Sequence, residues 1–374
     1  MRVLQVLGSS AGGVGRHVGQ VAAALSAAGD DVVVAGPLVV RPLVGGDARF
    51  EAVEITDRPR AGDVAAVRRL AALGRDADVV HAHGLRAGAL ALLAVRGLRR
   101  APEDGGRRPR VVVTLHNLPV GGRAIRAVSA VLERVVGRGA DVVLGVSPDL
   151  VELATARGAR RAELALVPAP RAVSVADDAA EVRSTRTALG LAGDERLLVT
   201  VGRLAPQKGL DDLVAAARAL AGTPHRFRWA VAGEGPLRGE LEAEVRASSA
   251  PVELLGARDD VGALLAAADV TVSTARWEGQ PLWLQEALAH GAAIVATDVG
   301  GTGAVVGDAA VLVPAEPAAQ VGGAVAEAVA RLLADDDARA GLRARARARA
   351  AALPTGADVV EQLATVYAGG RAAG

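Results

Sequence analysis

Short runs of aliphatic residues alternate along the chain with longer segments in which apolar residues recur every three or four positions. The first aliphatic run covers residues 3–7, and a glycine-rich loop follows it at residues 8–15. Helical spacing then covers residues 16–28, and a second aliphatic run covers residues 31–35. Aliphatic runs joined by a helix predict a parallel βαβ unit, with the glycine loop at the carboxyl end of its first strand. The loop does not have the G-x-G-x-x-G spacing, so we do not expect it to bind a dinucleotide.

The same alternation continues to the end of the chain. Further strands are predicted at residues 78–83, 110–115, 140–147, 197–201, 229–232, 252–255, 269–274 and 293–297. Helices are predicted at residues 121–138, 210–220, 282–289, 318–350 and 358–367. Strands that alternate with helices predict an α/β fold built on parallel sheets.

Domain boundaries follow from an irregular, charged stretch that begins at Pro168-Ala169-Pro170. We predict a first Rossmann-like domain at residues 1–170, a linker at residues 171–195 and a second Rossmann-like domain at residues 196–352. Residues 353–374 form a C-terminal segment. The length of 374 residues and the hydrophobic content of 51% are sufficient for two cores.

Composition excludes several classes of protein. The net charge of +1 argues against a nucleic-acid-binding surface that depends on bulk charge. The chain has no cysteine, and therefore neither disulfides nor cysteine metal sites. The longest uncharged apolar run in the N-terminal half, Ala87–Val95, is too short to span a bilayer, and we see no signal peptide. We therefore expect a soluble cytoplasmic protein.

Lys208 is the only lysine in a chain whose other basic side chains are arginine. A lysine that persists against such a coding bias is a candidate for a site that needs a compact point charge rather than a planar guanidinium. Chance is the alternative explanation.

Residues 273–301 predict a polar loop, a helix at residues 282–289 that directly follows Pro281, a short strand and a glycine turn. Glu278 precedes the helix and Glu286 lies within it. A helix N-terminus suits phosphate, whereas two carboxylates suit hydroxyl groups that donate hydrogen bonds. Phosphate together with several hydroxyls describes a nucleotide sugar.

This segment resembles the E-x7-E signature of retaining glycosyltransferases of the GT-B fold, the large family four. The resemblance is carried by Glu278, Gly279, Leu282, Glu286, Ala287, Gly291 and residues 296–301. A second match, residues 202–209, resembles the G-R-L-x-x-x-K-G loop of the same family and contains the lone lysine. The resemblance implies two Rossmann-like domains that face a cleft, with a C-terminal helix in residues 353–374 that packs back on the first domain.

The implied reaction is transfer of a sugar from a nucleotide diphosphate sugar, such as a UDP- or GDP-sugar, to an acceptor hydroxyl with retention of anomeric configuration. The family resemblance assigns catalytic roles to Glu278, His116, Arg203 and Lys208. It assigns donor binding to Gly13, Arg203, Lys208, Glu234, Arg258, Glu278, Gln280, Pro281, Leu282 and Glu286. Gln280-Pro281-Leu282 replaces the aromatic-glycine-leucine that is commoner in the family, and Ala169-Pro170 replaces its asparagine-glycine pair.

No metal or other cofactor is expected, because two cations already face the diphosphate. His81 and His83 point to one face of their strand, and we interpret them as hydrogen-bonded structural histidines, with a metal site as the alternative. A nucleotide-sugar epimerase and a non-catalytic nucleotide-sugar-binding protein are the competing functions. Release of free nucleotide diphosphate would distinguish them.

The acceptor class stays open among small molecules, glycans and lipid-linked compounds. The helix at residues 121–138 has an apolar face of Ile125, Val128, Leu132 and Val135, with arginines largely away from it. We expect this face to pack on the sheet. The alternative is that the helix docks on a membrane surface and makes the protein peripheral at the inner face of the membrane.

Overall fold

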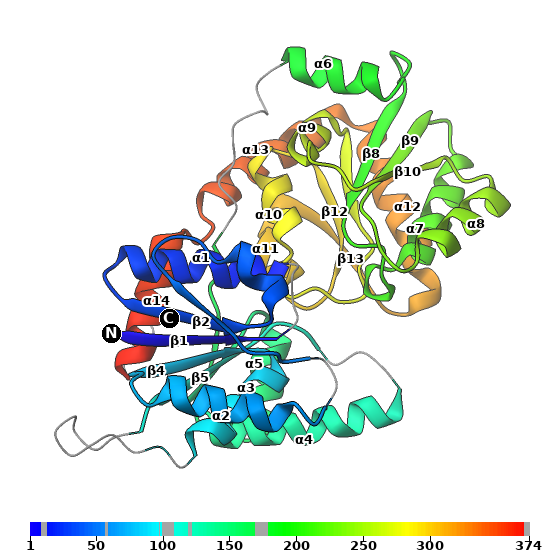
Figure 1. The fold of residues 1–374 in the computed structure, drawn as a ribbon. Coiled ribbons are helices and arrows are strands. Elements are labelled where there is room, and N and C mark those ends of the chain that lie inside the picture. Colours follow the sequence, from blue (N-terminus) through cyan, green and yellow to red (C-terminus); the bar gives the residue numbers. More distant parts are fainter. Residues whose placement is uncertain are drawn as a thin grey trace. The chain divides into compact units, whose positions relative to one another are not determined.

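The computed structural model of the chain describes residues 1–8, 13–56, 59–96, 98, 108–118, 122–168 and 179–369. The chain forms two compact units (Figure 1). Unit 1 comprises Met1–Pro168 and Pro354–Gly374, and unit 2 comprises Ala169–Leu353. Residues 9–12 of the predicted glycine loop and residues 171–178 of the predicted linker lie outside the described part of the chain.

Unit 1 contains a parallel sheet in the order β3-β2-β1-β4-β5-β6-β7. Its strands are β1 (Arg2–Leu7), β2 (Asp31–Gly36), β3 (Arg49–Ala52), β4 (Val79–His83), β5 (Arg110–Leu115), β6 (Val142–Gly145) and β7 (Ala162–Leu164). Its helices are α1 (Gly13–Ala27), η1 (Leu38–Leu43), α2 (Asp63–Gly74), α3 (Leu85–Val95), α4 (Arg123–Gly139), α5 (Pro148–Ala156) and α14 (Gly356–Ala368). The central strands are buried on both faces, which explains why they read as continuous aliphatic runs.

Unit 2 repeats this architecture with the parallel order β10-β9-β8-β11-β12-β13. Its strands are β8 (Arg196–Val201), β9 (Phe227–Ala232), β10 (Val252–Gly256), β11 (Val270–Ser273), β12 (Ile294–Asp298) and β13 (Ala310–Pro314). Its helices are α6 (Ala179–Ala188), η3 (Pro206–Lys208), α7 (Leu210–Ala221), α8 (Arg238–Ser248), α9 (Val261–Ala267), α10 (Leu282–Ala289), α11 (Thr302–Val306), η4 (Gly307–Ala309), α12 (Ala318–Ala334) and α13 (Asp336–Ala351).

Helices cover both faces of the unit 2 sheet (Figure 1). Side chains alternate along β8, so Leu197 and Val199 pack in one core while Leu198 packs in the other. One core includes α7 and α12, and the other includes α9 and α10. The predicted α/β fold with parallel sheets in two units is therefore confirmed.

Helix α6 lies within the segment that the sequence analysis expects to be a linker. Arg186 from this helix pairs with Asp269 at 2.9 Å and donates to the carbonyl oxygen of Ala267 at 3.1 Å. These contacts tie α6 to unit 2.

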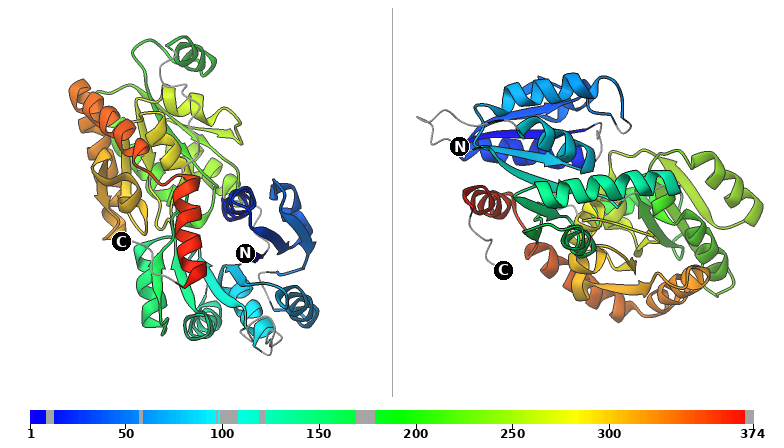
Figure 2. Two further views of the ribbon diagram at one scale, coloured as in Figure 1. Left: turned by 90° about the vertical axis from the view of Figure 1, so that its left-hand side faces the viewer. Right: turned by 90° about the horizontal axis from the view of Figure 1, so that it is seen from below.

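The C-terminal helix α14 packs on α1 of unit 1, as the predicted fold requires (Figure 2). Gln362 makes two hydrogen bonds that hold it there. Its amide oxygen accepts from the backbone N–H of Leu166 at 2.9 Å, and its amide nitrogen donates to the carbonyl of Leu164 at 2.8 Å. Residues at opposite ends of the chain thus complete unit 1.

Helix α4 contradicts one expectation. Its predicted apolar face does not pack on the sheet: Ile125 is 51% exposed, Val128 52% and Val135 41%, and only Leu132 is half-buried. The buried side of α4 is instead formed by residues such as Glu133 and Val136, and Glu133 pairs with Arg157 at 2.7 Å. The ion pair allows a glutamate to occupy the packed side, so the apolar stripe is left on the surface.

Candidate functional site in unit 2

The order of the strands in unit 2 reverses direction between β8 and β11. From β8 the chain moves to β9 and β10 on one side, and then β11 pairs with the other side of β8. Loops at the carboxyl ends of two such strands diverge and leave room for a ligand. The two predicted motifs, residues 202–209 and the loop that contains Glu278, follow these two strands. The sheet topology therefore brings the motifs to one point.

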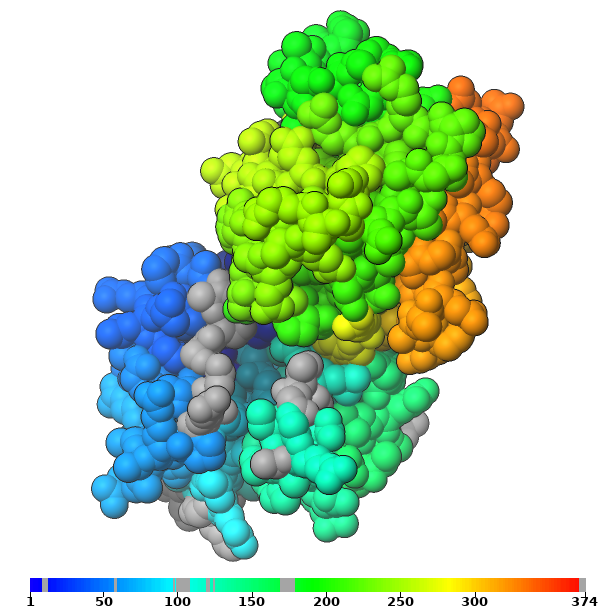
Figure 3. Space-filling view, turned by 90° about the vertical axis from the view of Figure 1, so that its right-hand side faces the viewer, coloured from blue at the N-terminus to red at the C-terminus, as the bar shows by residue number. Residues whose placement is uncertain are grey.

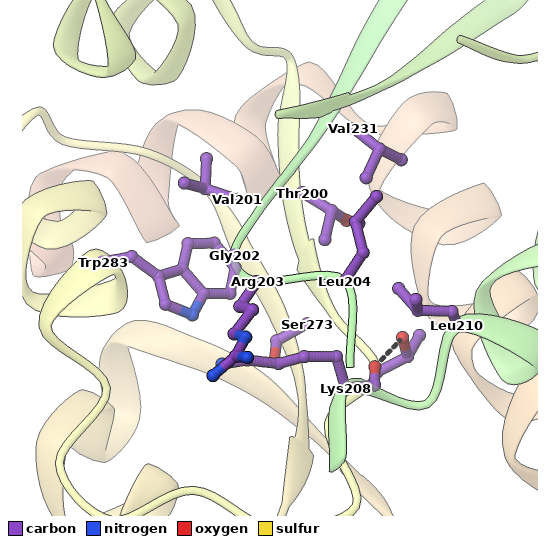
Figure 4. Close-up of a pocket in the computed structure, with 11 residues that line it drawn as sticks. Thr200, Val201, Gly202, Arg203, Leu204, Lys208, Leu210, Val231, Ser273 and Trp283 are labelled. Atoms are coloured by element: carbon purple, nitrogen blue, oxygen red, sulfur yellow. Dashed lines mark hydrogen bonds between the residues drawn. The ribbon is translucent and has the colours of Figure 1, made fainter. Parts of the chain in front are cut away.

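The backbone of these two loops is joined by hydrogen bonds. The Thr274 hydroxyl donates to the carbonyl of Lys208 at 3.1 Å, which is the dashed bond in Figure 4. The backbone N–H of Arg276 donates to the carbonyl of Gln207 at 2.8 Å. Gly209 adopts a positive φ of 58°, and a Cβ there would lie 2.1 Å from the Thr274 carbonyl oxygen. Only glycine permits so close an approach, so the packing of the two loops requires glycine at position 209, directly after Lys208.

Lys208 and Glu278 form an ion pair across the two loops. Their side chains are 17% and 12% exposed, so the pair is largely shielded from solvent. Arg203, from the same loop as Lys208, is exposed. Within the described part of the chain its guanidinium makes no ion pair or hydrogen bond. Figure 4 shows Arg203 and Lys208 extending from one loop beside Trp283. Two cations and one carboxylate therefore gather at the switch point.

Glu278 is held at its own backbone by the glycine turn after β12. The backbone N–H of Gly301 donates to the Glu278 carbonyl at 2.9 Å. Gly300 has a φ of 52°, and a Cβ at this position would lie 1.9 Å from the same carbonyl oxygen. The glycine pair that the sequence places after β12 thus fixes the loop that carries Glu278.

Helix α10 begins at Leu282, as predicted, with Pro281 at its N-cap. The backbone N–H groups of Leu284 and Gln285 donate to the Pro281 carbonyl. The first N–H groups of the helix, at Leu282 and Trp283, precede these bonds and are free of intrahelical partners. Glu286 lies one turn further along the same helix and is half-buried. The helix start therefore presents N–H donors at the loop that contains Gln280.

Glu234 and Arg258 follow β9 and β10 at the same carboxyl edge of the sheet. Each is already paired with a neighbour. Glu234 forms an ion pair with Arg238, and the Arg258 guanidinium binds both carboxylate oxygens of Asp260, with 2.8 Å between Arg258 Nε and Asp260 Oδ1. Their predicted contact with a donor stays a prediction.

Trp283 is a residue that the sequence analysis did not single out. It lines the same pocket as Thr200, Arg203 and Lys208, and its indole N–H is buried without a partner in the described part of the chain. The sequence did contain a signal, since Trp283 is one of three tryptophans in a chain with 2% aromatic residues.

The remaining two predicted residues lie in unit 1. Gly13 is the first residue of α1 and is exposed, whereas Gly12 beside it lies outside the described residues. His116 directly follows β5 and is half-buried. Their predicted contacts with the donor and the transferred sugar stay predictions.

His116 belongs to a cluster of four histidines that the sequence analysis found only in part. His83 Nδ1 lies 3.1 Å from His116 Nε2, and the rings of His81 and His83 are 4.3 Å apart. The ring of His17, from α1, is 5.6 Å from that of His116. In the described part of the chain, no three His, Cys, Asp or Glu side chains are placed to hold a metal ion.

Burial keeps these histidines neutral. It lowers the pKa of His17 to about 4 and, with a smaller effect of His17, that of His81 to about 3. Burial, followed by the neighbouring histidines, also lowers the pKa values of His83 and His116 well below the ordinary value. At neutral pH each ring therefore has one N–H donor and one acceptor nitrogen.

Both units match known glycosyltransferase families. Residues 12–170 match the family described as "Glycosyl transferase 4-like domain", and residues 195–335 match the family described as "Glycosyl transferases group 1". TuaC of Bacillus subtilis (strain 168), named as a glycosyltransferase of teichuronic acid biosynthesis, is 35% identical over 146 residues, which are 39% of this chain and 35% of TuaC. EpsF of the same organism, also named as a glycosyltransferase, is 33% identical over 115 residues, or 30% of each chain. The matched parts thus span about a third of these curated relatives.

Several solved structures share the fold over nearly the whole chain. HepE of Anabaena, in complex with UDP, aligns with a TM-score of 0.77 at 19% identity and covers 99% of this chain and 100% of HepE. The UDP-forming trehalose-phosphate synthase of Burkholderia vietnamiensis aligns with a TM-score of 0.74 at 19% identity, over 99% and 100% of the two chains. WaaG, named as a glycosyltransferase involved in lipopolysaccharide biosynthesis, aligns with a TM-score of 0.71 at 19% identity and covers 98% of this chain and 100% of WaaG. The fold is therefore that of the GT-B glycosyltransferases.

Proposed function

We propose that this protein is a glycosyltransferase that moves a sugar from a UDP- or GDP-sugar to an acceptor hydroxyl, with retention of anomeric configuration. The observation that carries the proposal is the meeting of Arg203, Lys208 and Glu278 at the switch point of unit 2. The glycosyltransferase family matches in both units support it. HepE has been solved with UDP and with UDP-glucose, which favours a uridine donor.

Charge stabilisation on the leaving diphosphate is the central chemical step of this proposal. Cleavage of the bond between the sugar and the diphosphate leaves an extra negative charge on the leaving phosphate. Arg203 offers a bidentate guanidinium, Lys208 offers a point charge, and the N–H groups at the start of α10 offer further donors. Donors that are fixed before the reaction stabilise this charge without having to reorganise. A bound diphosphate would compete with Glu278 for Lys208.

The two carboxylates would take the hydroxyl groups of the donor. Glu278, next to Lys208, would bind hydroxyls of the sugar, and Glu286, further along α10, would bind the ribose. Gln280, Pro281 and Leu282 would line the sugar pocket. We also propose that Glu234 and Arg258 lie near the base, and that Gly13 and His116 contact the diphosphate and the transferred sugar. No metal or other cofactor has a part in this proposal.

A panel of UDP- and GDP-sugars tests the function. A donor at 100 times its dissociation constant should stabilise the protein by about 2.7 kcal/mol, and free nucleotide diphosphate should form slowly even without acceptor. Arg203→Ala should weaken both effects. Arg218→Ala, which removes an exposed arginine from α7, is the matched control and should leave them unchanged. Conversion of the donor without release of diphosphate would indicate an epimerase, and stabilisation without turnover would indicate a binding protein.

We further propose that α4 docks on an anionic membrane surface. Ile125, Val128 and Val135 form an exposed stripe, which Val131, 59% exposed, extends. Arg134 and Arg138 are exposed three residues after Val131 and Val135, so they lie beside the stripe on the helix. Figure 2 shows α4 across the face seen from below, and Figure 3 shows its first turns at the surface in blue-green. No described helix is long and apolar enough to cross a membrane.

Apolar side chains flanked by arginines suit a bilayer with anionic headgroups, where each surface arginine contributes about 1 kcal/mol. Sedimentation with vesicles of phosphatidylcholine alone, or with an equal part of phosphatidylglycerol, measures this contact. We expect binding to the mixed vesicles only, and loss of binding in Val128→Ser/Val131→Ser. Val64→Ser, which alters a valine that is 58% exposed on α2, is the matched control. Equal sedimentation of all three proteins would contradict membrane docking by α4.

A further inference from the structure

A continuous chain of hydrogen bonds runs through unit 1 from Thr114 to His116 and includes Tyr367 of the C-terminal helix. Its members, in order, are Thr114, His81, Tyr367, Gln5, His83 and His116. His81 lies 2.7 Å from the Thr114 hydroxyl and 2.7 Å from the Tyr367 hydroxyl. Gln5 lies 3.1 Å from Tyr367 and 2.7 Å from His83, and His83 lies 3.1 Å from His116. All members except His116 are buried.

Every link of this chain depends on the next one. Burial keeps the three histidines neutral and raises the pKa of Tyr367, so no member carries a charge at neutral pH. A neutral imidazole donates through one nitrogen and accepts through the other. The proton position on one ring therefore decides the proton position on the ring beside it. The hydrogen bonds of the chain can therefore be donated in only two directions, and the orientation of one member shows which direction is present.

The Gln5 amide distinguishes the two directions, because it has a donor end and an acceptor end, and its bonds to Tyr367 and His83 hold it in one orientation. Its amide nitrogen lies 3.1 Å from the Tyr367 hydroxyl and can only donate, so the hydroxyl oxygen accepts this bond and its own proton is directed to His81, 2.7 Å away. The tyrosine hydroxyl thus accepts from Gln5 and donates to His81 Nδ1. At the other end of the amide, Gln5 Oε1 accepts from His83 Nε2–H.

The proton on His116 follows from this direction. Because His83 Nε2 carries a proton, its Nδ1 is an acceptor, and His116 Nε2–H donates to it. His116 Nδ1 then bears a lone pair. In the described part of the chain that atom has no hydrogen-bond partner, and the ring is only half-buried. It is thus placed to accept a hydrogen bond from a ligand.

We propose that Tyr367 is a positioning residue that acts through Gln5 and His83 to hold His116 in its Nε2–H tautomer, with Nδ1 presented as an acceptor to a substrate hydroxyl. The part that concerns the substrate rests on the proposed function, but the tautomer does not. Helix α14 would then contribute more than packing to unit 1, because it supplies the hydroxyl that orders the chain. When the tautomer of His116 is fixed, a hydroxyl bound to Nδ1 can only donate its hydrogen bond.

Nitrogen NMR of the histidine rings tests the proposal without any substrate. The protonated and unprotonated nitrogens of a neutral imidazole give well-separated ¹⁵N shifts, and His116→Asn assigns the signals of His116. At pH 7.5 we expect His116 to carry its proton on Nε2. Tyr367→Phe removes the hydroxyl that orients Gln5, and we expect the His116 signals to become an average of the two tautomers.

The control variant is Gln362→Ala, which loosens the same helix through its bonds to Leu164 and Leu166 but leaves the chain intact. It should lower thermal stability without moving the His116 signals. A wild-type His116 with its proton on Nδ1 would overturn the proposed direction, whether or not any variant folds. Unchanged His116 signals in a folded Tyr367→Phe protein would show that Tyr367 does not set the tautomer. If the protein transfers sugar, Tyr367→Phe should also lower kcat/KM by about tenfold while Gln362→Ala does not.

Discussion

The two units have the same architecture but place opposite chemistry at equivalent points of their sheets. Each parallel sheet reverses its strand order once, between β1 and β4 in unit 1 and between β8 and β11 in unit 2. In unit 2 the loops after that point carry the charged side chains of Arg203, Lys208 and Glu278. In unit 1 the strands at that point carry Gln5 and two neutral histidines. Equal folds thus support an electrostatic site in one unit and an uncharged hydrogen-bond network in the other.

This difference has a physical consequence for how each region tolerates change. The activity of a charged, partly exposed site depends on the identity of a few side chains, and these side chains contribute little to the stability of the fold. A buried neutral network depends on every member keeping its protonation state, because an unpaired buried polar group costs about 1–3 kcal/mol. We therefore expect substitutions in unit 2 to affect turnover and acid to affect the stability of unit 1.

Acid should give the largest effect. Above pH 6.5 the histidines are neutral in both the folded and the unfolded chain. Below it the unfolded chain takes up protons, while His17 and His81 stay neutral until about pH 4 and about pH 3. Each histidine then lowers the free energy of unfolding by about 1.4 kcal/mol per pH unit, so the two together cost about 4 kcal/mol between neutral pH and pH 5.

Hydrogen exchange followed by mass spectrometry can assign this loss to one unit. After correction for the intrinsic effect of pH, protection of β4 and β5 should fall at pH 5, whereas that of β8 and β11 should fall less. His17→Asn removes one of the four clustered histidines whose pKa values are lowered, and it should reduce the pH dependence by about a quarter. An equal loss of protection in both units would contradict the contrast between them.

Substitutions of Lys208 should give the next largest effect, and on turnover rather than stability. Lys208→Ala removes one of two cations from the proposed diphosphate site and should lower kcat/KM by about 100- to 1,000-fold. Lys208→Arg keeps the charge, but a guanidinium is wider than an ammonium in a position already crowded by Glu278. We expect it to lower kcat/KM by about tenfold, or about 1.4 kcal/mol.

The reverse exchange, Arg203→Lys, is the control for charge alone, because Arg203 is exposed and makes no ion pair within the described residues. Thermal unfolding should be nearly unchanged in the two variants that keep a cation, Lys208→Arg and Arg203→Lys. Wild-type kcat/KM in Lys208→Arg would show that the single lysine is an accident of composition.

The two glutamates should separate binding from turnover. Glu278 is held beside Lys208, so Glu278→Ala should mainly lower kcat. Glu286 lies further along α10, so Glu286→Ala should mainly raise KM for the donor, by about tenfold for the loss of a hydrogen bond to a charged group. Steady-state kinetics on both variants measure the two parameters. Equal changes of kcat and KM in both variants would remove this division of roles.

The contrast between the units also explains what the sequence could predict. The loops of the unit 2 site can be recognised in the sequence because Arg203 and Lys208 lie within one short segment after β8. Glu278 lies in the loop after β11, the strand beside β8 at the switch point. Helix α10 was predicted with its observed bounds, since a proline starts it and Gly291 follows its end. Local signals of this kind survive in a single sequence.

The network of unit 1 has no such signal. Gln5 and Tyr367 are 362 positions apart, and they meet only because α14 returns to the first unit. His17 comes from α1 and joins His116 without any shared motif. The expectation that the apolar stripe of α4 packs on the sheet is wrong for a related reason. Periodicity shows that a helix has two faces, but the ion pair of Glu133 with Arg157, the residue after α5, favours burial of the face that carries Glu133.

Removal of divalent metal should have the smallest effect. It tests whether the side chains of unit 2 can neutralise a bound diphosphate without a metal ion. A metal ion would neutralise the diphosphate if the protein did not, and it would need carboxylate ligands nearby. Here the diphosphate would meet Arg203 and Lys208, while Glu278 is paired with Lys208 and Glu234 with Arg238. We therefore expect kcat/KM after treatment with EDTA to equal that before it. Thermal stabilisation by UDP should likewise be the same with EDTA and with Mg²⁺. Loss of activity that Mg²⁺ or Mn²⁺ restores would mean that the two cations do not suffice, and that a carboxylate of unit 2 must leave its ion pair to hold a metal.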